Sequence, residues 1–278
     1  MITNKERLEI LEIPETLTAS IKVREGIILT SVKINGKTKQ FIIDSGAPSM
    51  VLNSRYVIRT SNSEERKFKG ISGKGTSFTS DIKNFTWENF KLKNFKTLAI
   101  DFSHLESALN EKIHGLIGYK ELSLFTFAID YKNEKITLWR NFSKHKNPIK
   151  KSVPFVLQNH LPVFRFSCGK TILNLALDTG AAQNVIDIAL KKKLRGKFSF
   201  GKESSLQGAS TESAAVKEIS LNEVETGLIT LKKFPAIWHD MSHIKNEGIE
   251  IDGLIGYQFL KKGKFAISYS DAKIYLLK

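Results

Sequence analysis

Two aspartates, Asp44 and Asp178, have the surroundings in this sequence that most favour chemistry. Asp44 lies in the stretch Phe41–Asn53 and Asp178 in the stretch Leu175–Asp187, and each ends an apolar run and precedes a hydroxyl residue and a glycine. Glycine permits the backbone angles of a tight turn, so each carboxylate is expected at the end of a strand. Two carboxylates held close together cannot both ionise cheaply, and a shared proton lets one act as a base and the other as an acid.

The elements that must position these aspartates occur twice in the chain. Ile113–Arg140 aligns without a gap to Ile251–Lys278, and half of the aligned positions are identical. Just upstream, Asp101–Leu105 is echoed by Asp240–Ile244. Because order and spacing are kept, the sequence predicts two similar lobes that each contribute one aspartate turn.

Both turns have the form Asp-Ser/Thr-Gly-Ala, and each is followed by a Gly-Leu-Ile-Gly, at residues 115–118 and 253–256. This pattern resembles the two-lobed aspartic peptidases, most closely the compact bacterial retropepsin-like members, over nearly the whole chain. The resemblance implies a mostly β fold of two pseudo-twofold-related, β-barrel-like lobes with few short helices. It also implies an aspartic endopeptidase that hydrolyses an extended peptide or protein substrate in a cleft between the lobes, through an activated water and without a metal or other cofactor.

The resemblance also assigns roles to the residues of the two turns. Asp44 and Asp178 are expected to be the catalytic dyad, and the hydroxyl residue after each aspartate is expected to reach the backbone of the opposite lobe. The residues expected to support the dyad in this way are Ser45, Gly46, Thr179 and Gly180. Ala47 and Ala181 stand where the digestive members tend to carry further hydroxyls that stabilise the charged dyad. Loss of those hydrogen bonds raises the pKa of the pair, so we expect a pH optimum in the mildly acidic to near-neutral range.

A glycine-rich stretch, Phe68–Thr76, suggests a mobile hairpin tip, and the second half has Gln207–Ser210 at the matching place. In the resembled family a flap at this position closes over the bound peptide and excludes water. This sequence departs from the digestive members because no tyrosine stands in the flap. The residues expected to contact substrate are Gly70, Ile71, Ser72, Gly73, Thr76, Gly208, Ala209 and Ser210.

Two alternative functions are compatible with the sequence. A non-catalytic peptide-binding protein on the same fold is one, although both aspartates are retained. The net charge of +15 suggests a basic polyanion-binding protein as the other. Apart from Lys191–Arg195, however, the basic residues are spread along the chain, which is typical of a solvated surface, and we expect no nucleic acid as partner.

The lobes are expected at residues 1–143 and 144–278, with the boundary in the polar and basic segment Asn141–Lys151. Asn35-Gly36 predicts a hairpin turn before the first aspartate. The other elements expected from the pattern are strands at Phe85–Phe90, Thr97–Asp101 and Lys273–Leu277 and short helices at Ser103–Lys112 and Asp187–Arg195. Two motifs in one chain make a monomer sufficient for activity.

Two histidines and the one cysteine could act as metal ligands or as a nucleophile, but their places in the sequence favour structural roles. His104 and His243 occupy equivalent places just before a predicted helix, where a polar side chain caps backbone groups more often than it binds a metal. Cys168, the only cysteine, lies in a segment that aligns with Ile34–Lys37 at a hairpin turn, and it excludes an internal disulfide and a thiolate zinc site.

The composition indicates an ordinary globular protein. The chain has 278 residues, of which 41% are hydrophobic, enough for two modest cores. The sequence contains neither an apolar run of membrane-spanning length nor the basic-then-apolar start of a signal peptide. We therefore expect a cytoplasmic protein if the chain is complete, and a periplasmic or secreted one if a leader has been removed.

Overall fold

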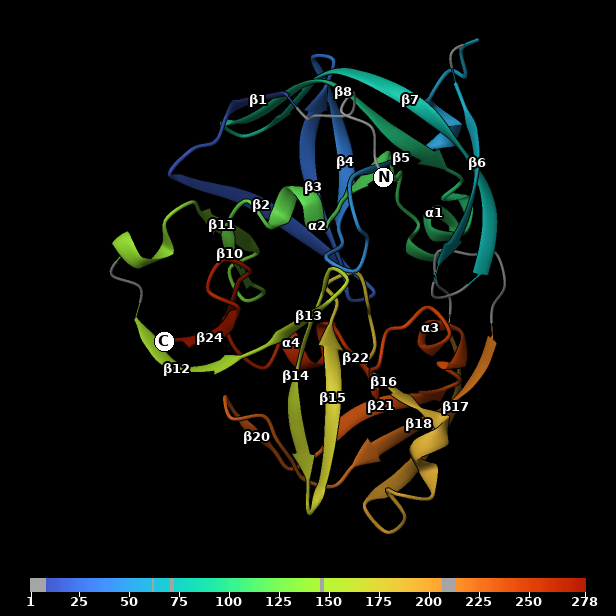
Figure 1. Ribbon diagram of the computed structural model, residues 1–278, viewed down its shortest axis with the longest axis vertical. Coiled ribbons are helices and arrows are strands. Elements are labelled where there is room, and N and C mark those ends of the chain that lie inside the picture. Colours follow the sequence, from blue (N-terminus) through green and yellow to red (C-terminus); the bar gives the residue numbers. More distant parts are fainter. Residues whose placement is uncertain (1–8, 62, 71–72, 146–147, 207–213) are drawn as a thin grey trace.

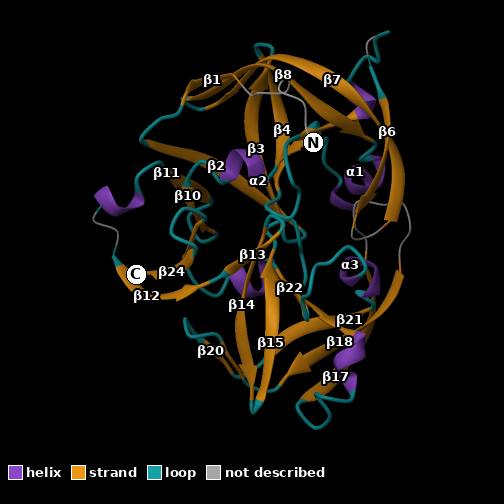
Figure 2. Cartoon of the chain, in the orientation of Figure 1, coloured by secondary structure: helices purple, strands orange, loops and turns teal. Residues whose placement is uncertain are grey.

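The structure is a computed structural model that describes residues 9–61, 63–70, 73–145, 148–206 and 214–278. One half of the chain fills the upper part of Figure 1, in blue to green, and the other fills the lower part, in yellow to red. Strands dominate both halves and the helices are short (Figure 2). This agrees with the mostly β, two-lobed fold predicted from the duplicated sequence.

The described elements follow a similar order in the two halves. The first half contains β1 (Glu9–Glu12), β2 (Thr16–Arg24), β3 (Ile27–Ile34), β4 (Lys37–Ile43), β5 (Val51–Asn53), η1 (Ser54–Tyr56), β6 (Glu65–Gly70), β7 (Gly73–Trp87), β8 (Phe90–Ile100), α1 (Ser103–Leu109), β9 (Gly115–Ile117), α2 (Tyr119–Leu122), β10 (Thr126–Asp130), β11 (Lys135–Trp139) and η2 (Phe142–Lys144). The second half contains β12 (Ile149–Pro154), β13 (Val156–Gln158), β14 (Leu161–Cys168), β15 (Thr171–Leu177), β16 (Val185–Asp187), η3 (Ile188–Lys191), β17 (Phe198–Leu206), β18 (Ala214–Leu221), β19 (Val224–Glu225), β20 (Thr230–Leu231), β21 (Phe234–His239), α3 (Ser242–Lys245), β22 (Gly253–Ile255), α4 (Tyr257–Leu260), β23 (Phe265–Ser268) and β24 (Lys273–Leu277). Among the described elements, β19 and β20 have no counterpart between β7 and β8.

The strand pairings around the two aspartate turns are the same. In the first half β9 lies between β4, to which it is parallel, and β5, to which it is antiparallel. In the second half β22 lies in the same way between β15 and β16. The Gly-Leu-Ile strand of each half therefore runs beside the strand that delivers the aspartate. Glycine is required in this strand because a Cβ on Gly115 or Gly253 would lie about 2.5 Å or less from the backbone of the neighbouring strand.

A shared sheet joins the halves along a pseudo-twofold axis. The described strands form a fourteen-stranded and a ten-stranded sheet, and the larger one includes β12, β23 and β24 from the second half. It crosses between halves where β10 pairs with β23, and there Ala128 faces its own sequence counterpart, Ala266. On either side of this pair, Phe127 faces Ile267 and Ile129 faces Phe265, so the register is symmetric about it.

This exchange of strands bears on the predicted domain division. The proposed boundary at 143/144 falls within η2, shortly before β12, at the left of Figure 1. The C-terminal hairpin of β23 and β24 nevertheless completes a sheet that begins in the first half. The division at 143/144 stays a prediction.

Equivalent apolar clusters hold α1 and α3 against the aspartate strands. In the first half Phe102, Leu109 and Ile113 pack with Ile42 and Leu116. The second half repeats the arrangement with a cluster that includes Ala176, Met241, Ile244, Ile251 and Leu254. A larger cluster of buried residues continues through both halves. Removal of this apolar surface from water is the main force that fixes the two turns in place.

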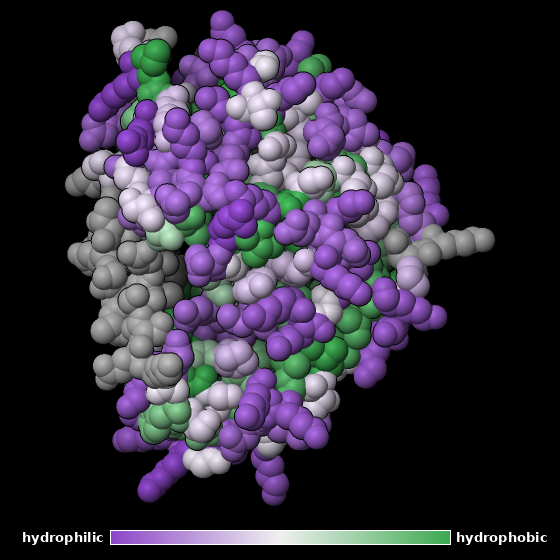
Figure 3. Space-filling model, turned by 180° about the vertical axis from the view of Figure 1, so that it is seen from behind, coloured by the Kyte–Doolittle hydropathy of each residue, from purple (hydrophilic) through white to green (hydrophobic). Residues whose placement is uncertain are grey.

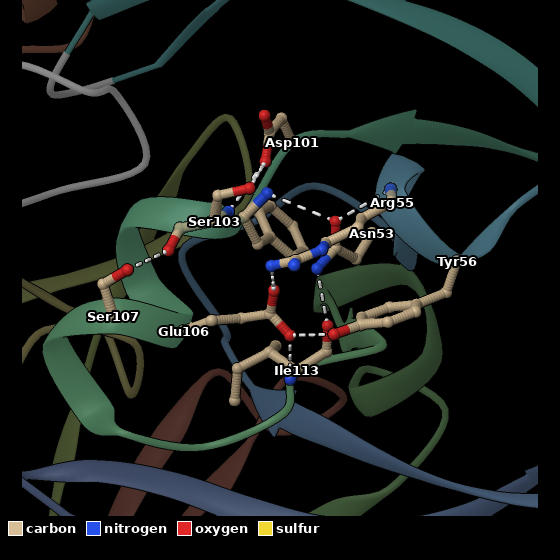
Figure 4. A network of polar contacts seen from close by, with 9 residues as sticks. Asn53, Arg55, Tyr56, Asp101, Ser103, Glu106, Ser107 and Ile113 are labelled. Atoms are coloured by element: carbon tan, nitrogen blue, oxygen red, sulfur yellow. Dashed lines mark hydrogen bonds and ion pairs between the residues drawn. The ribbon is translucent and has the colours of Figure 1, made fainter.

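A partly buried polar network surrounds Glu106 of α1 in the first half (Figure 4). The Glu106 carboxylate accepts hydrogen bonds from Tyr56 Oη, Arg55 Nη1 and the Ile113 N–H. Burial by itself raises the pKa of Glu106, but the hydrogen bonds from Tyr56, Ile113 and Arg55 together hold this pKa below its ordinary value. Asn53 joins the same network through the Ile113 carbonyl.

The second half carries the same kind of support with the charges exchanged. Asp187 takes the place of Asn53, and Lys245 takes the place of Glu106 in the matching helix. Lys245 and Asp187 form a hydrogen-bonded ion pair, and Asp187 also accepts from the Ala189 N–H. The two halves therefore use opposite charges on the helix to tie it to the equivalent strand end.

Several predictions about individual elements are confirmed or corrected. The strand at Lys273–Leu277 is confirmed as β24 and the hairpin at Asn35-Gly36 as the turn between β3 and β4. The single strand predicted at Phe85–Phe90 is wrong, because β7 and β8 meet there in a hairpin in which Trp87 faces Phe90. The helix predicted at Asp187–Arg195 is reduced to the single turn η3.

The interpretation of the two paired histidines also needs correction. His104 and His243 lie within α1 and α3 and not before them. The first turns are capped instead by Asp101 and Asp240, whose carboxylates accept from N–H groups two residues later. Cys168 is the last residue of β14, next to the predicted turn, and is 1% exposed.

The face seen from behind in Figure 3 is largely hydrophilic. Hydrophilic side chains cover most of the face seen from behind, and hydrophobic residues form only broken patches on it (Figure 3). None of the helices in the described part of the chain is long and apolar enough to cross a membrane.

Candidate active site

The two aspartates occupy equivalent positions at the ends of β4 and β15. The Asp44 N–H donates to the Ile117 carbonyl at 3.0 Å, and the Asp178 N–H donates to the Ile255 carbonyl at 2.9 Å. Each acceptor belongs to the Gly-Leu-Ile strand of the same half. These bonds continue the strand pairing by one residue and fix the start of each turn to a rigid frame.

The two aspartate turns contact one another, and the carboxylate of each aspartate lies against the glycine backbone of the opposite turn. The Gly46 N–H donates to Oδ1 of both Asp44, at 2.9 Å, and Asp178, at 3.1 Å. The Gly180 N–H donates to Asp178 Oδ1 at 2.8 Å. A Cβ on Gly46 would lie 2.4 Å from the Asp178 carboxylate, and one on Gly180 would lie 2.4 Å from the Asp44 carboxylate. The structure thus brings together Asp44, Asp178 and both glycines.

The hydroxyl residues of the turns cross between the halves. The Ser45 N–H donates to Thr179 Oγ1 at 2.9 Å, and the Thr179 N–H donates to Ser45 Oγ at 3.0 Å. Thr179 Oγ1 in turn donates to the Ile43 carbonyl at 3.0 Å. Both side chains are buried, so each bond replaces one that water could otherwise make. The reciprocal pair locks the two turns to one another.

Burial dominates the electrostatics of the pair. Burial raises the pKa of Asp44 well above its usual range, and the charge of Asp178 and a hydrogen bond with it raise this pKa further. Burial also raises the pKa of Asp178, but the N–H groups of Gly180 and Gly46 and the hydrogen bond with Asp44 oppose the rise. The N–H groups of Gly46 and Ala47 likewise oppose the rise in the pKa of Asp44. This environment favours a single proton shared by the two carboxyl groups.

Two different side chains support the glycines that end the Gly-Leu-Ile-Gly segments. In the first half Glu121 Oε2 accepts from the Gly118 N–H at 3.2 Å. In the second half Asn184 Oδ1 accepts from the Gly256 N–H at 3.0 Å. Glu121 comes from α2 and Asn184 from the loop before β16, so the same backbone group is satisfied from different elements. Burial raises the pKa of Glu121 from 4.5 to about 7.

Glu121→Gln is expected to flatten the dependence of stability on pH. Because the folded pKa of Glu121 is raised, its contribution to stability is fully present below pH 4.5 and is lost as the pH rises through about 7. Between about pH 4 and about pH 8 this group should cost the wild type about 3 kcal/mol of unfolding free energy, and the glutamine variant should not show this loss. Denaturant unfolding of both proteins at the two pH values measures the difference.

Glu106→Gln is the matched control for that experiment. The pKa of Glu106 is lowered, so its contribution is present above its ordinary pKa and is lost as the pH falls. This variant should therefore be less stable than the wild type at neutral pH. If Glu121→Gln kept the full pH dependence of the wild type, Glu121 would not be the group that titrates.

His114 and Asp252 are the one difference between the stretches Ile113–Tyr119 and Ile251–Tyr257, and both side chains accept a hydrogen bond from the same backbone position. Asp252 Oδ2 accepts from the Asn174 N–H at 2.8 Å, and His114 Nδ1 accepts from the equivalent Gln40 N–H at 3.3 Å. Burial and the charge of nearby Lys39 lower the pKa of His114, which favours the neutral ring that this role requires. The imidazole therefore replaces the carboxylate as the acceptor.

The expected flap residues are only partly described. Gly70 ends β6, and Gly73 and Thr76 lie in β7, with Gly70 facing Gly73 across the hairpin. Thr76 also borders a small polar cavity between this hairpin and η1, which is lined by Ser54, Arg59, Glu65, Thr76, Ser77, Phe78, Ala99 and Asp101. Ile71, Ser72, Gly208, Ala209 and Ser210 lie outside the described residues.

One residue beside the turns was missed from the sequence. His160 Nε2 lies 2.6 Å from the Gly46 carbonyl oxygen, although the histidine belongs to the turn between β13 and β14. The half-to-half alignment carried a signal, because Gly26 occupies the equivalent position in the first half. Among the described residues no three His, Cys, Asp or Glu side chains are grouped so that they could hold a metal ion.

Comparison with known proteins identifies the family. A model of the family described as aspartyl protease matches the chain twice, at residues 30–120 and 165–259. The two matches together cover more than half of the chain, and each contains one aspartate turn and one Gly-Leu-Ile-Gly segment. A comparison with curated proteins finds no match. The repeated match agrees with the two-lobed fold, and the chain belongs to the aspartyl protease family.

Proposed function

We propose that this protein is an aspartic endopeptidase in which Asp44 and Asp178 act as one catalytic dyad. The observation that carries the proposal is the Gly46 N–H, which donates to both carboxylates, at 2.9 Å and 3.1 Å. One backbone group can serve two carboxylates only if these lie side by side. Membership of the aspartyl protease family supports a peptide or protein as substrate.

The proposed reaction gives the two aspartates complementary roles. The dyad holds one proton, as is known for the paired carboxylates of aspartic peptidases. Ionised Asp178 takes a proton from a water molecule as the water attacks the scissile carbonyl carbon, and neutral Asp44 donates a hydrogen bond to the carbonyl oxygen. Asp178 then gives this proton to the leaving nitrogen as the C–N bond breaks, and the dyad returns to its starting state with one proton.

The reciprocal bonds of Ser45 and Thr179 support this scheme because they fix the separation of the turns. Proton transfer between the carboxylates and a water requires heavy-atom distances near 3 Å, and small displacements are costly. Buried cross-lobe bonds are a means to keep that geometry without help from a partner chain. We infer that one copy of the chain is sufficient for activity.

The substrate is proposed to bind in extended form between the lobes, with apolar side chains on either side of the cleaved bond. We further propose that residues 1–143 and 144–278 act as the two lobes of the cleft. The hairpins of β6 with β7 and of β17 with β18 stand at equivalent positions in the halves. They are the proposed flaps that cover the peptide and exclude water.

Digestion of a mixed peptide library tests this function. The wild type is expected to cleave internal peptide bonds, and mass spectrometry identifies the new termini. Asp44→Asn and Asp178→Asn serve as negative controls. Binding of library peptides without cleavage by the wild type would favour a peptide-binding protein instead. Retention on nucleic acid that weakens steeply with salt and ignores both substitutions would favour the polyanion binder.

A further inference from the structure

The turn between β13 and β14, in the second half, contacts the aspartate turn of the first half. His160, half-buried in the turn between β13 and β14, has Nε2 2.6 Å from the Gly46 carbonyl oxygen. Its ring lies 5.9 Å from that of Tyr119, centroid to centroid. A carbonyl oxygen can only accept, so Nε2 carries a hydrogen and donates it, whether the imidazole is neutral or charged.

The equivalent turn on the other side of the pseudo-twofold axis has a glycine in place of the histidine. Gly26, the counterpart of His160, stands against Ala182 and Tyr257 near the second aspartate turn. A Cβ at Gly26 would lie 2.9 Å from the Tyr257 ring and 3.2 Å from Ala182. An imidazole therefore reaches the first turn, and its counterpart at the second turn is a glycine.

A single peptide group links the imidazole to the dyad. The carbonyl of the peptide between Gly46 and Ala47 accepts from His160, and the N–H of the same peptide donates to Asp44 Oδ1 at 3.1 Å. Hydrogen bonds in such a chain polarise one another, so a charged imidazole strengthens the bond to Asp44. A positive charge on His160 also lowers the pKa of Asp178.

We propose that His160 is a positioning residue that holds the first aspartate turn through the Gly46 carbonyl and, in its protonated form, stabilises the charged dyad. The ionisable groups that face it are Asp178 from the second turn and Tyr119 from α2, and Asp44 is reached through the peptide between Gly46 and Ala47. The inference rests on the proposed function for its effect on catalysis. Its effect on the aspartates themselves requires no turnover.

The test compares His160→Gln with the wild type. Glutamine keeps an N–H donor for the Gly46 carbonyl but cannot carry a positive charge. Two quantities are measured across pH: kcat/KM on a peptide substrate, and the titration of the Asp44 and Asp178 carboxyl carbons by NMR, assigned with Asp44→Asn and Asp178→Asn. Removal of a nearby cation raises carboxyl pKa values, so both the acidic limb of kcat/KM and the carboxyl titration should move up by about half to one pH unit.

Two further variants separate charge from hydrogen bonding and from general effects of histidine loss. His160→Ala removes the donor as well and should lower kcat about tenfold relative to His160→Gln at the optimum. His145→Gln makes the same chemical change beside Trp139 and Thr16. It should leave the pH profile of kcat/KM and the carboxyl titrations unchanged.

The outcomes are distinguishable. A wild type that cleaves, with identical pH profiles and carboxyl titrations in His160→Gln, would overturn the role of His160 and leave the proposed function standing. A wild type that cleaves no peptide would overturn the proposed function, and the carboxyl titrations alone would then decide whether His160 controls the pair. A shift in His160→Gln but not in His145→Gln supports the inference.

Discussion

Asparagine in place of either Asp44 or Asp178 is expected to lower kcat/KM by about 10³-fold or more. An amide cannot take a proton from the attacking water, and it cannot share one with the remaining carboxylate. The two variants should lose activity to a similar extent because each aspartate holds one of two complementary roles. Initial rates on a single peptide identified from the library, with protein concentration matched, measure the loss.

The fold of both variants should survive, which separates loss of chemistry from loss of structure. Burial raises the pKa of both carboxyl groups, so the neutral amide removes a costly charge, and the melting temperature should not fall. Asp81→Asn, on the exposed face of β7, is the matched control and should retain full activity. If either dyad variant cleaved at near the wild-type rate, that residue would not be part of the chemistry.

Alanine at Gly46 or Gly180 is expected to be nearly as damaging, with kcat reduced about 10²-fold or more. A methyl group at Gly46 would lie 2.4 Å from the Asp178 carboxylate, and one at Gly180 would lie 2.4 Å from Asp44. Neither turn can accept the methyl group without pushing the opposite aspartate away. The effect therefore crosses between the halves, which a purely local role for the glycines does not predict.

Gly36→Ala is the control for the glycine variants. Gly36 has a φ of +80° but open space around it, so alanine there should cost about 1 kcal/mol of stability and leave kcat unchanged. Steady-state kinetics and thermal unfolding of the three variants give both quantities. Full activity in Gly46→Ala and Gly180→Ala would contradict the close approach of each glycine to the opposite carboxylate.

Much of the fold could be predicted because the sequence contains an internal duplication. The two aspartate turns and the two Gly-Leu-Ile-Gly segments occur at matching places in the halves, and the structure pairs them in the same way in each half. The symmetric register about Ala128 and Ala266 follows from the same duplication. The hairpin between β7 and β8 was missed because its turn, Glu88-Asn89, contains no glycine or proline. Glu88 adopts a φ of +51° there, which the sequence pattern does not favour.

The parts of the site that the sequence did not predict depend on contacts between distant segments. Glu121 and Asn184 satisfy equivalent backbone groups from different elements, so alignment of the halves does not pair them. His160 reaches Gly46 across the lobe interface, and no local motif marks it. The aspartate turns could be predicted because their chemistry and their backbone geometry reside in the same few residues.

The claim that Asp44 and Asp178 form one unit is tested most directly by a double-mutant cycle. The kcat/KM values of the wild type, Asp44→Asn, Asp178→Asn and the double variant are measured on one peptide under one set of conditions. Residues that act as a unit are strongly non-additive, so the double variant should be about as slow as the slower single variant. Losses that multiply in the double variant would mean that the two aspartates act independently, and would contradict the account.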